Sequence, residues 1–190
     1  YRGAMIETAS PPPAGERRWR DDLHLAHTIA DQVDPLTRAH FDNQDFEVET
    51  KPDLTPVTAA DREAERLIRD YLSRARTRDS VLGEEFGVTG HSPRQWIIDP
   101  IDGTKNFVRG VPVWATLISL VEDGRVVVGL ASAPALGKRW WAVAGGGAWS
   151  GRSLALAHQL HVSGVTALED ASLSYSSLSG WAERRRLRGM

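Results

Sequence analysis

The stretch that decides the fold is WIIDPIDGTKNF, residues Trp96–Phe107. Its apolar start predicts a buried strand, yet the strand runs into two aspartates, Asp99 and Asp102, separated by Pro-Ile. Two acids in such a place are costly unless a cation accompanies them. Gly103 and Thr104 then predict a turn or helix start, whose backbone N–H groups can cradle a phosphate. The stretch therefore predicts an anionic strand end beside an anion-binding turn.

A second pair of acids, Glu84 and Glu85, follows the short apolar strand expected at Ser80–Gly83. If this strand neighbours the one that leads to Asp99, the carboxylates converge at one edge of the sheet. Such a cluster repels itself and raises its own pKa values, and divalent cations remove that conflict. The Ile101 carbonyl offers a further oxygen. Oxygen donors without cysteine or paired histidines favour Mg²⁺ over zinc.

Metal ions beside a phosphate cradle favour phosphoryl chemistry, in which a water molecule attacks in line with the leaving oxygen. The candidates that could orient this water are the Asp61 carboxylate and the Thr104 hydroxyl. Each motif also has a simpler interpretation. Glu84-Glu85 alone is typical of a solvated turn, Asp61 alone of a helix cap, and Asp-Gly after a strand of a plain turn.

The composition excludes several function classes. The chain has 190 residues, a formal net charge of -2 and no cysteine. It therefore offers no basic field for nucleic acid or a membrane surface, and no disulfide, thiolate site or cysteine nucleophile. Residues 1–18 contain a proline triplet and lack the apolar core of a signal peptide, so a disordered tail or a cloning remnant is expected there. A cytoplasmic protein is the simplest interpretation.

Two helices are expected before the strand region. Apolar residues at helical spacing predict the first over Trp19–Phe41, with a kink or an end at Pro35. The second begins after Thr58, which is a good N-cap, and Asp61 stands three residues on, in the capping-box position.

Short apolar segments then predict a run of strands. They are Ser80–Gly83, Gln95–Asp99, Val113–Glu122, Arg125–Ser132, Arg139–Ala144 and Ala148–Ser150. Asp123-Gly124 is a two-residue hairpin signal between two of them. The pattern predicts an α+β fold with helices packed on an antiparallel sheet. We expect an N-terminal domain at 19–150 and the start of a second, α/β domain at 151–190, where LALAHQLHVS and ASLSYSSLS favour further strands.

Three motifs together carry a family resemblance. TKPDLTPVTAAD (Thr50–Asp61), GEEFG (Gly83–Gly87) and WIIDPIDGTKNF resemble the inositol monophosphatase superfamily of Mg²⁺-dependent, lithium-sensitive phosphomonoesterases. The resemblance covers about Trp19–Trp181. It implies the sugar-phosphatase fold, a homodimer, a small phosphomonoester substrate and two or three Mg²⁺ ions per complete site, with Mn²⁺ able to substitute.

The same resemblance implies a role for each matching residue. The implied metal ligands are Glu84, Asp99, the Ile101 carbonyl and Asp102. The implied catalytic set is Asp61 and Thr104, which position the water, with Glu85 and Lys51 as accessory residues, and the implied phosphate-binding turn is Gly103-Thr104.

Two non-catalytic stretches narrow the resemblance. VRGVPVWATLISL (Val108–Leu120) and SAPAL with RWWA look most like actinobacterial histidinol-phosphate phosphatases, which implies L-histidinol phosphate as the substrate. Inositol 1-phosphate or a related sugar phosphate is the alternative. A different alternative is an inactive metal-binding fragment with a role in assembly or regulation.

One family feature is missing from these 190 residues. The second domain of the family carries a Trp-Asp motif whose aspartate is a further metal ligand. The chain is expected to be truncated, or its remainder is not represented in this sequence. A protein that ends at Met190 is expected to bind divalent metal weakly, to expose apolar surface and to show little phosphatase activity.

Overall fold

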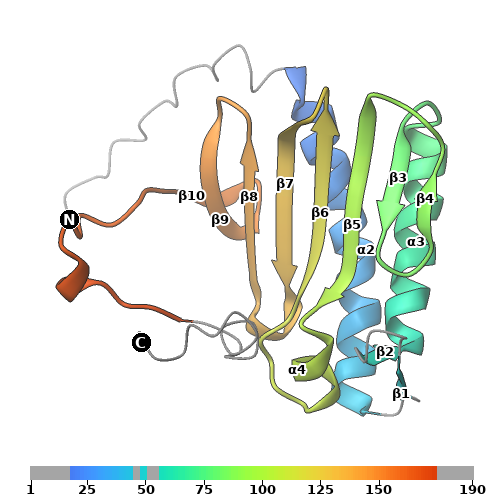
Figure 1. Cartoon of the computed structure of the whole chain (residues 1–190), viewed down its shortest axis with the longest axis horizontal. Coiled ribbons are helices and arrows are strands. Elements are labelled where there is room, and N and C mark those ends of the chain that lie inside the picture. Colours follow the sequence, from blue (N-terminus) through green and yellow to red (C-terminus); the bar gives the residue numbers. More distant parts are fainter. Residues whose placement is uncertain (1–17, 45–47, 51–55, 175–190) are drawn as a thin grey trace, which may run out of the picture. The chain divides into compact units, whose positions relative to one another are not determined.

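The computed structural model describes residues 18–44, 48–50 and 56–174. Helices and strands follow one another along the chain as Figure 1 shows. In chain order the elements are α2 (Arg20–Asn43), β1 (Val48–Thr50), β2 (Pro56–Thr58), α3 (Ala59–Ala75), β3 (Ser80–Gly83), β4 (Gly87–Thr89), β5 (Arg94–Asp102), α4 (Thr104–Val108), β6 (Ala115–Glu122), β7 (Arg125–Ala133), η1 (Pro134–Leu136), β8 (Lys138–Val143), β9 (Gly147–Ser153), β10 (Leu156–Leu160) and η2 (Leu168–Asp170).

Helix α2 forms where the apolar spacing predicts it, but it does not end at Pro35. The residues on both sides of the proline are held by tertiary contacts. Val33 is fully buried, and the Asp34 carboxylate accepts a hydrogen bond from Arg139 at 2.7 Å. The Thr37 hydroxyl donates to the Val33 carbonyl at 3.0 Å. Burial of the helix face therefore offsets the backbone hydrogen bond that the proline removes.

Helix α3 begins with the capping box that the sequence predicts. The Asp61 Oδ2 atom accepts hydrogen bonds from the Thr58 backbone N–H at 2.7 Å and from the Thr58 hydroxyl at 2.6 Å, and the Thr58 side chain accepts from the Asp61 N–H. These bonds satisfy backbone donors that have no partner inside the helix. The start of α3 is therefore fixed.

The main sheet has eight strands in the order β10-β9-β8-β7-β6-β5-β3-β4. Every neighbouring pair is antiparallel except β3 and β5, which run parallel. The expected antiparallel sheet is therefore corrected at this pair, because the chain crosses from β3 through the antiparallel edge strand β4 to reach β5. The hairpin at Asp123-Gly124 is confirmed, with φ angles of 50° and 75°.

Helices α2 and α3 cover one face of the sheet (Figure 1), as the α+β prediction requires. The main core lies between these helices and the sheet. It contains, among others, Ala26, Ile29, Val33, Ala64, Ile68, Trp96, Ile98, Ile118, Leu120 and Val128. A second, smaller cluster consists of Ala60, Ile101, Phe107 and Trp114. This cluster ties the first turn of α3 to the end of β5 and to α4, which is where the predicted site residues lie.

The first compact unit of the chain extends to Leu160, and His161 begins the second. Strands β9 and β10 pair with each other at the sheet edge, so residues 151–160 lie in the first unit. The strand expected in LALAHQLHVS is confirmed by β10. Of the segment ASLSYSSLS, residues 171–174 form no strand and the rest lies outside the described residues. Among the described helices, none combines the length and apolarity that crossing a bilayer requires.

Candidate metal centre and active site

The parallel pairing of β3 and β5 brings the predicted acids together. In this pair Gly83 lies opposite Ile98. The residue that follows each of these two is an acid, Glu84 after Gly83 and Asp99 after Ile98. Because parallel strands leave the sheet at the same edge, the two carboxylates meet there. The condition set by the sequence, that these strands be neighbours, is fulfilled.

A bulge in β5 accounts for the position of the second aspartate. Asp99 pairs with Leu117 and Asp102 with Ala115, so two residues of β5 stand opposite one residue of β6. Residues three apart on a regular strand point to opposite faces, and a bulge with its local bend changes this. The Thr116 hydroxyl holds the bulge by donating to the Pro100 carbonyl at 2.8 Å.

The Asp99 carboxyl group is strongly perturbed. Burial, followed by the charge of Glu84 and a hydrogen bond with it, and then by the charge of Asp102, raises the pKa of Asp99 to about 8. The Asp99 Oδ1 atom is buried and has no hydrogen-bond partner among the described residues. A buried acceptor without a donor, among like charges, is the environment that a divalent cation stabilises. The residues present therefore fit a hard cation with oxygen ligands.

The side chains alone do not complete a metal site. In the described part of the chain, no group of three or more His, Cys, Asp or Glu side chains is arranged to hold a metal ion. Glu84 and Asp99 contact each other, whereas Asp102 contributes through its charge. The Ile101 carbonyl accepts a hydrogen bond from the Thr104 hydroxyl at 3.0 Å, which leaves it a second lone pair. The assignment of these four residues as ligands stays a prediction.

The turn after β5 has the expected form. Gly103 is the N-cap of α4 and has a φ of 92°, in the left-handed region that favours glycine. A Cβ atom at Gly103 would lie 3.1 Å from the Val113 carbonyl and 3.4 Å from the Trp114 Cα, so the neighbouring chain also requires a small residue. The turn and helix start are confirmed at Gly103-Thr104, and phosphate binding there stays a prediction.

Asp61 follows Ala60, which belongs to the cluster with Ile101, Phe107 and Trp114 that packs the first turn of α3 against the end of β5. Its side chain is buried, with 1% exposed, and Oδ2 is bound to Thr58.

Of the other predicted site residues, Glu84 is exposed and Glu85 is half-buried in the turn after β3. Lys51 lies outside the described residues.

A residue that sequence reasoning missed is Glu65. Its side chain is fully buried, and it accepts hydrogen bonds from the backbone N–H groups of Glu85 at 2.7 Å and of Phe86 at 3.1 Å. The sequence held one signal, since Glu65 stands four residues after Asp61 and so on the same side of the helix. An acid on a buried helix face needs a partner, and here the partner is the turn that carries Glu84.

With this geometry in place, the comparison with family models decides the relationship. The model described as "Inositol monophosphatase family" matches residues 19–189. The chain belongs to the inositol monophosphatase family. The fold expected from the sequence motifs is thereby confirmed.

Relatives in this family include histidinol-phosphatases of actinobacteria. The histidinol-phosphatase of Streptomyces coelicolor is 65% identical over 173 residues, which are 89% of this chain and 65% of that protein. That of Mycobacterium tuberculosis is 60% identical over 163 residues, 85% of this chain and 63% of that protein. The chain thus spans slightly less than two thirds of the length of these relatives.

Solved structures of the family share the fold. An IMPase of Thermotoga maritima superposes with a TM-score of 0.71 at 32% sequence identity, over 88% of this chain and 65% of that one. The similarity therefore extends through most of the described residues.

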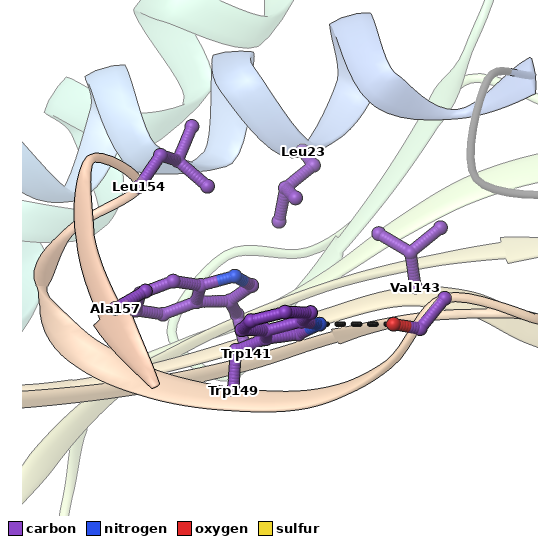
Figure 2. A pocket seen from close by; sticks show the side chains of 7 residues that line it. Leu23, Trp141, Val143, Trp149, Leu154 and Ala157 are labelled. Atoms are coloured by element: carbon purple, nitrogen blue, oxygen red, sulfur yellow. Dashed lines mark hydrogen bonds between the residues drawn. The ribbon is translucent and has the colours of Figure 1, made fainter. Parts of the chain in front are cut away.

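One hollow of this family member lies apart from the predicted site residues. It measures about 180 Å³ and is lined by Leu23, Trp141, Val143, Gly146, Trp149, Leu154 and Ala157. Figure 2 shows the two indole rings in this hollow, with the Trp149 Nε1 atom donating to the Gly146 carbonyl at 2.9 Å. None of the predicted site residues lines it, and no side chain that lines it carries a charge. The hollow therefore lacks the groups that the predicted chemistry requires.

Proposed function

We propose that the protein containing this chain is a Mg²⁺-dependent phosphomonoesterase that hydrolyses L-histidinol phosphate to L-histidinol and inorganic phosphate. The observation that carries the chemistry is the parallel β3–β5 pair, which brings the Glu84 carboxylate to the Asp99 carboxyl group. The Asp99 Oδ1 atom there is buried and has no hydrogen-bond partner among the residues that the structure describes. The substrate rests on the 65% identity to the histidinol-phosphatase of Streptomyces coelicolor. Histidine biosynthesis is then the process that the protein serves.

The metal would be held by Glu84, Asp99, Asp102 and the Ile101 carbonyl, all at the end of the β3–β5 pair. When bound, divalent ions would neutralise these carboxylates and supply Lewis-acid activation of water and stabilisation of the leaving oxygen. We propose two or three Mg²⁺ ions per complete site, with Mn²⁺ as a substitute. A further aspartate, of the family's Trp-Asp motif, would complete the ligand set.

The remaining site residues have the following proposed tasks. Asp61 and Thr104 orient the water that attacks phosphorus, with the Asp61 carboxylate as the proton acceptor. The backbone N–H groups at Gly103-Thr104 bind the phosphate oxygens, since the first amides of a helix have no partner within it. Glu85 and Lys51 act as accessory residues near the metal. Direct attack by water gives inorganic phosphate without a covalent enzyme intermediate.

The test is phosphate release from L-histidinol phosphate, inositol 1-phosphate and a third sugar phosphate, by the protein as its gene encodes it, with Mg²⁺ and with EDTA. We expect histidinol phosphate to be hydrolysed with the highest kcat/KM and EDTA to abolish turnover. Preferred hydrolysis of inositol 1-phosphate would refute the substrate and favour the alternative, which the likeness to the IMPase of Thermotoga maritima supports. No hydrolysis of any substrate would refute the enzyme proposal.

A matched pair of variants separates the two kinds of site residue. Asp61→Asn should lower kcat by orders of magnitude and leave Mg²⁺ affinity close to that of the wild type, because Asp61 acts in the transition state. Asp99→Asn should instead lower Mg²⁺ affinity directly. The assigned roles would be wrong if Asp61→Asn abolished metal binding but kept the turnover per bound metal.

Two further properties are proposed for the whole protein. We propose that it acts in the cytoplasm as a homodimer on a small-molecule substrate, without nucleic acid or membrane partners. The net charge of -2, which gives no basic field, supports the absence of polyanion binding. Sedimentation of the protein as its gene encodes it tests the dimer, and a monomer at micromolar concentration would refute it.

A further inference from the structure

The carboxylate of Glu65 binds backbone amides of the turn that carries Glu84. This turn spans Glu84–Phe86, between β3 and β4. Glu65 Oε2 accepts the Glu85 N–H at 2.7 Å and Oε1 accepts the Phe86 N–H at 3.1 Å. A carboxylate that accepts two backbone amides is a charge-assisted bridge, stronger than neutral hydrogen bonds. The side chain is fully buried, so the bridge is shielded from water.

Arg69, one helical turn further along α3, extends the bridge to the far side of the turn. Its Nε atom donates to Glu65 Oε1 at 2.8 Å, and its terminal nitrogens donate to the Gly87 carbonyl and, at 2.9 Å, to the Thr89 hydroxyl. Only 16% of the Arg69 side chain is exposed. The guanidinium therefore neutralises Glu65 and also holds the start and end of β4.

The Glu65 and Arg69 side chains pack directly against Gly83, at the end of β3. A Cβ atom at Gly83 would lie 2.0 Å from Glu65 Oε1 and 2.8 Å from an Arg69 terminal nitrogen. The Glu65 carboxylate thus occupies the space of a side chain directly before Glu84. Any movement of the Glu65–Arg69 pair must move the turn with it.

We propose that Glu65 and Arg69 are positioning residues that hold the Glu84–Phe86 turn and so present the Glu84 carboxylate to Asp99 for divalent-cation binding. The inference rests on the proposed metal site and assigns it a supporting pair. Because Asp61 and Glu65 lie four residues apart on α3, the same helix also sets the distance between the metal ligands and the group that orients the water.

The physical need for such a pair follows from the position of Glu84. Glu84 is exposed on a short turn between β3 and β4, so a mobile turn would move its carboxylate away from Asp99. The metal would then have to draw the turn back, and its affinity would fall by the cost of ordering the turn. Groups that orient metal ligands typically change metal affinity 10–100-fold when they are lost.

The experiment compares wild type, Glu65→Gln and a control in the protein as its gene encodes it. Mn²⁺ affinity is measured by titration of the electron paramagnetic resonance signal of free Mn²⁺, and hydrogen exchange reports the Glu85 and Phe86 amides without metal. The control is Asp70→Asn, which removes an exposed pair of the same spacing on the same helix, with Arg74 at 3.6 Å.

We expect Glu65→Gln to bind Mn²⁺ about 10–100-fold more weakly than wild type, to exchange both amides faster, and to regain at least half of the wild-type kcat at saturating Mg²⁺. Asp70→Asn should match wild type in all three measurements. Recovery at saturating metal separates positioning from general loss of structure, which added Mg²⁺ does not repair. If Glu65→Gln fails to fold, Arg69→Lys decides by the same measurements, since lysine keeps the charge but cannot hold all three partners.

Each result has a distinct meaning. Wild-type Mn²⁺ affinity and unchanged amide exchange in Glu65→Gln would overturn the positioning role and leave the proposed function standing. Absence of Mn²⁺ binding by the wild type would overturn the proposed metal site and the positioning role with it. A loss of kcat that saturating Mg²⁺ does not restore would also overturn the positioning role.

Discussion

Asp99→Asn should make the metal-free protein more stable, and more so at higher pH. In the folded protein burial and the neighbouring acids Glu84 and Asp102 raise the pKa of Asp99 to about 8, against 3.8 for an unperturbed aspartate. A group whose folded pKa is raised contributes stability that is present below its unfolded pKa and is lost as the pH rises toward its folded pKa. Between pH 4 and pH 8 the unfolded chain releases this proton and the folded chain keeps it. Asparagine does not titrate, so the variant lacks this loss.

The magnitude follows from the two pKa values of Asp99. Each pH unit inside the window costs about 1.4 kcal/mol, so the free energy of unfolding of the wild type should fall by about 2.6 kcal/mol more than that of Asp99→Asn between pH 5 and pH 7. Saturating Mg²⁺, at about 100 times its dissociation constant, should then return about 2.7 kcal/mol to the wild type. It should return little to Asp99→Asn, which lacks a ligand.

The assay is urea unfolding at pH 5 and pH 7, first in EDTA and then in Mg²⁺, on the protein as its gene encodes it. Titrating groups that do not interact with Asp99 act equally in both proteins and cancel in the difference, so the difference reports Asp99 together with its neighbours Glu84 and Asp102. The control is Asp123→Asn, which removes one carboxylate from an exposed hairpin residue at a φ of 50° that asparagine also adopts. An Asp99→Asn difference that is the same at pH 5 and pH 7 would refute the assigned environment of Asp99.

Three further changes test the fold around the site. Gly83→Ala should cost about 2–3 kcal/mol in urea unfolding, because its Cβ would overlap Glu65, and an unchanged midpoint would contradict the close seating of that carboxylate. His27 is buried, and burial together with the charge of Arg139 lowers its pKa to about 4 from 6.5. The unfolded chain therefore takes up this proton first as the pH falls, so the wild type should lose about 2 kcal/mol more than His27→Gln between pH 7 and pH 5, and equal losses would refute this. Arg94→Ala should cost about 3 kcal/mol, since Arg94 pairs with three carboxylates that would then repel, and a thermal melt that does not shift would show that the network is not stabilising.

Local signals in the sequence were sufficient for most elements of the fold. The capping box at Thr58 and Asp61, the hairpin at Asp123-Gly124 and the turn at Gly103 all formed as predicted. Each depends on hydrogen bonds or backbone angles within a few residues, so the residue types alone carry the information. The helix end that was one of two expected effects of Pro35 did not form, because α2 is held across the proline by burial and by Arg139.

The amino-acid sequence by itself determined which groups could form the site: Glu84, Asp99 and Asp102 at strand ends, with Gly103 and Thr104 beside them. Only the tertiary structure decided that Glu84 and Asp99 meet. The parallel alignment of β3 with β5 depends on contacts between segments distant along the chain. So does the burial of the Asp99 Oδ1 atom, which has no hydrogen-bond partner within the described part of the chain. The role of Glu65 also depends on tertiary structure. The sequence shows that Glu65 lies on the same side of the helix as Asp61, but it does not show which groups Glu65 binds. The types of the functional groups can be read from short stretches of sequence. The pKa of each group depends on its distance from other charges and on its burial, and both are set only when the chain folds.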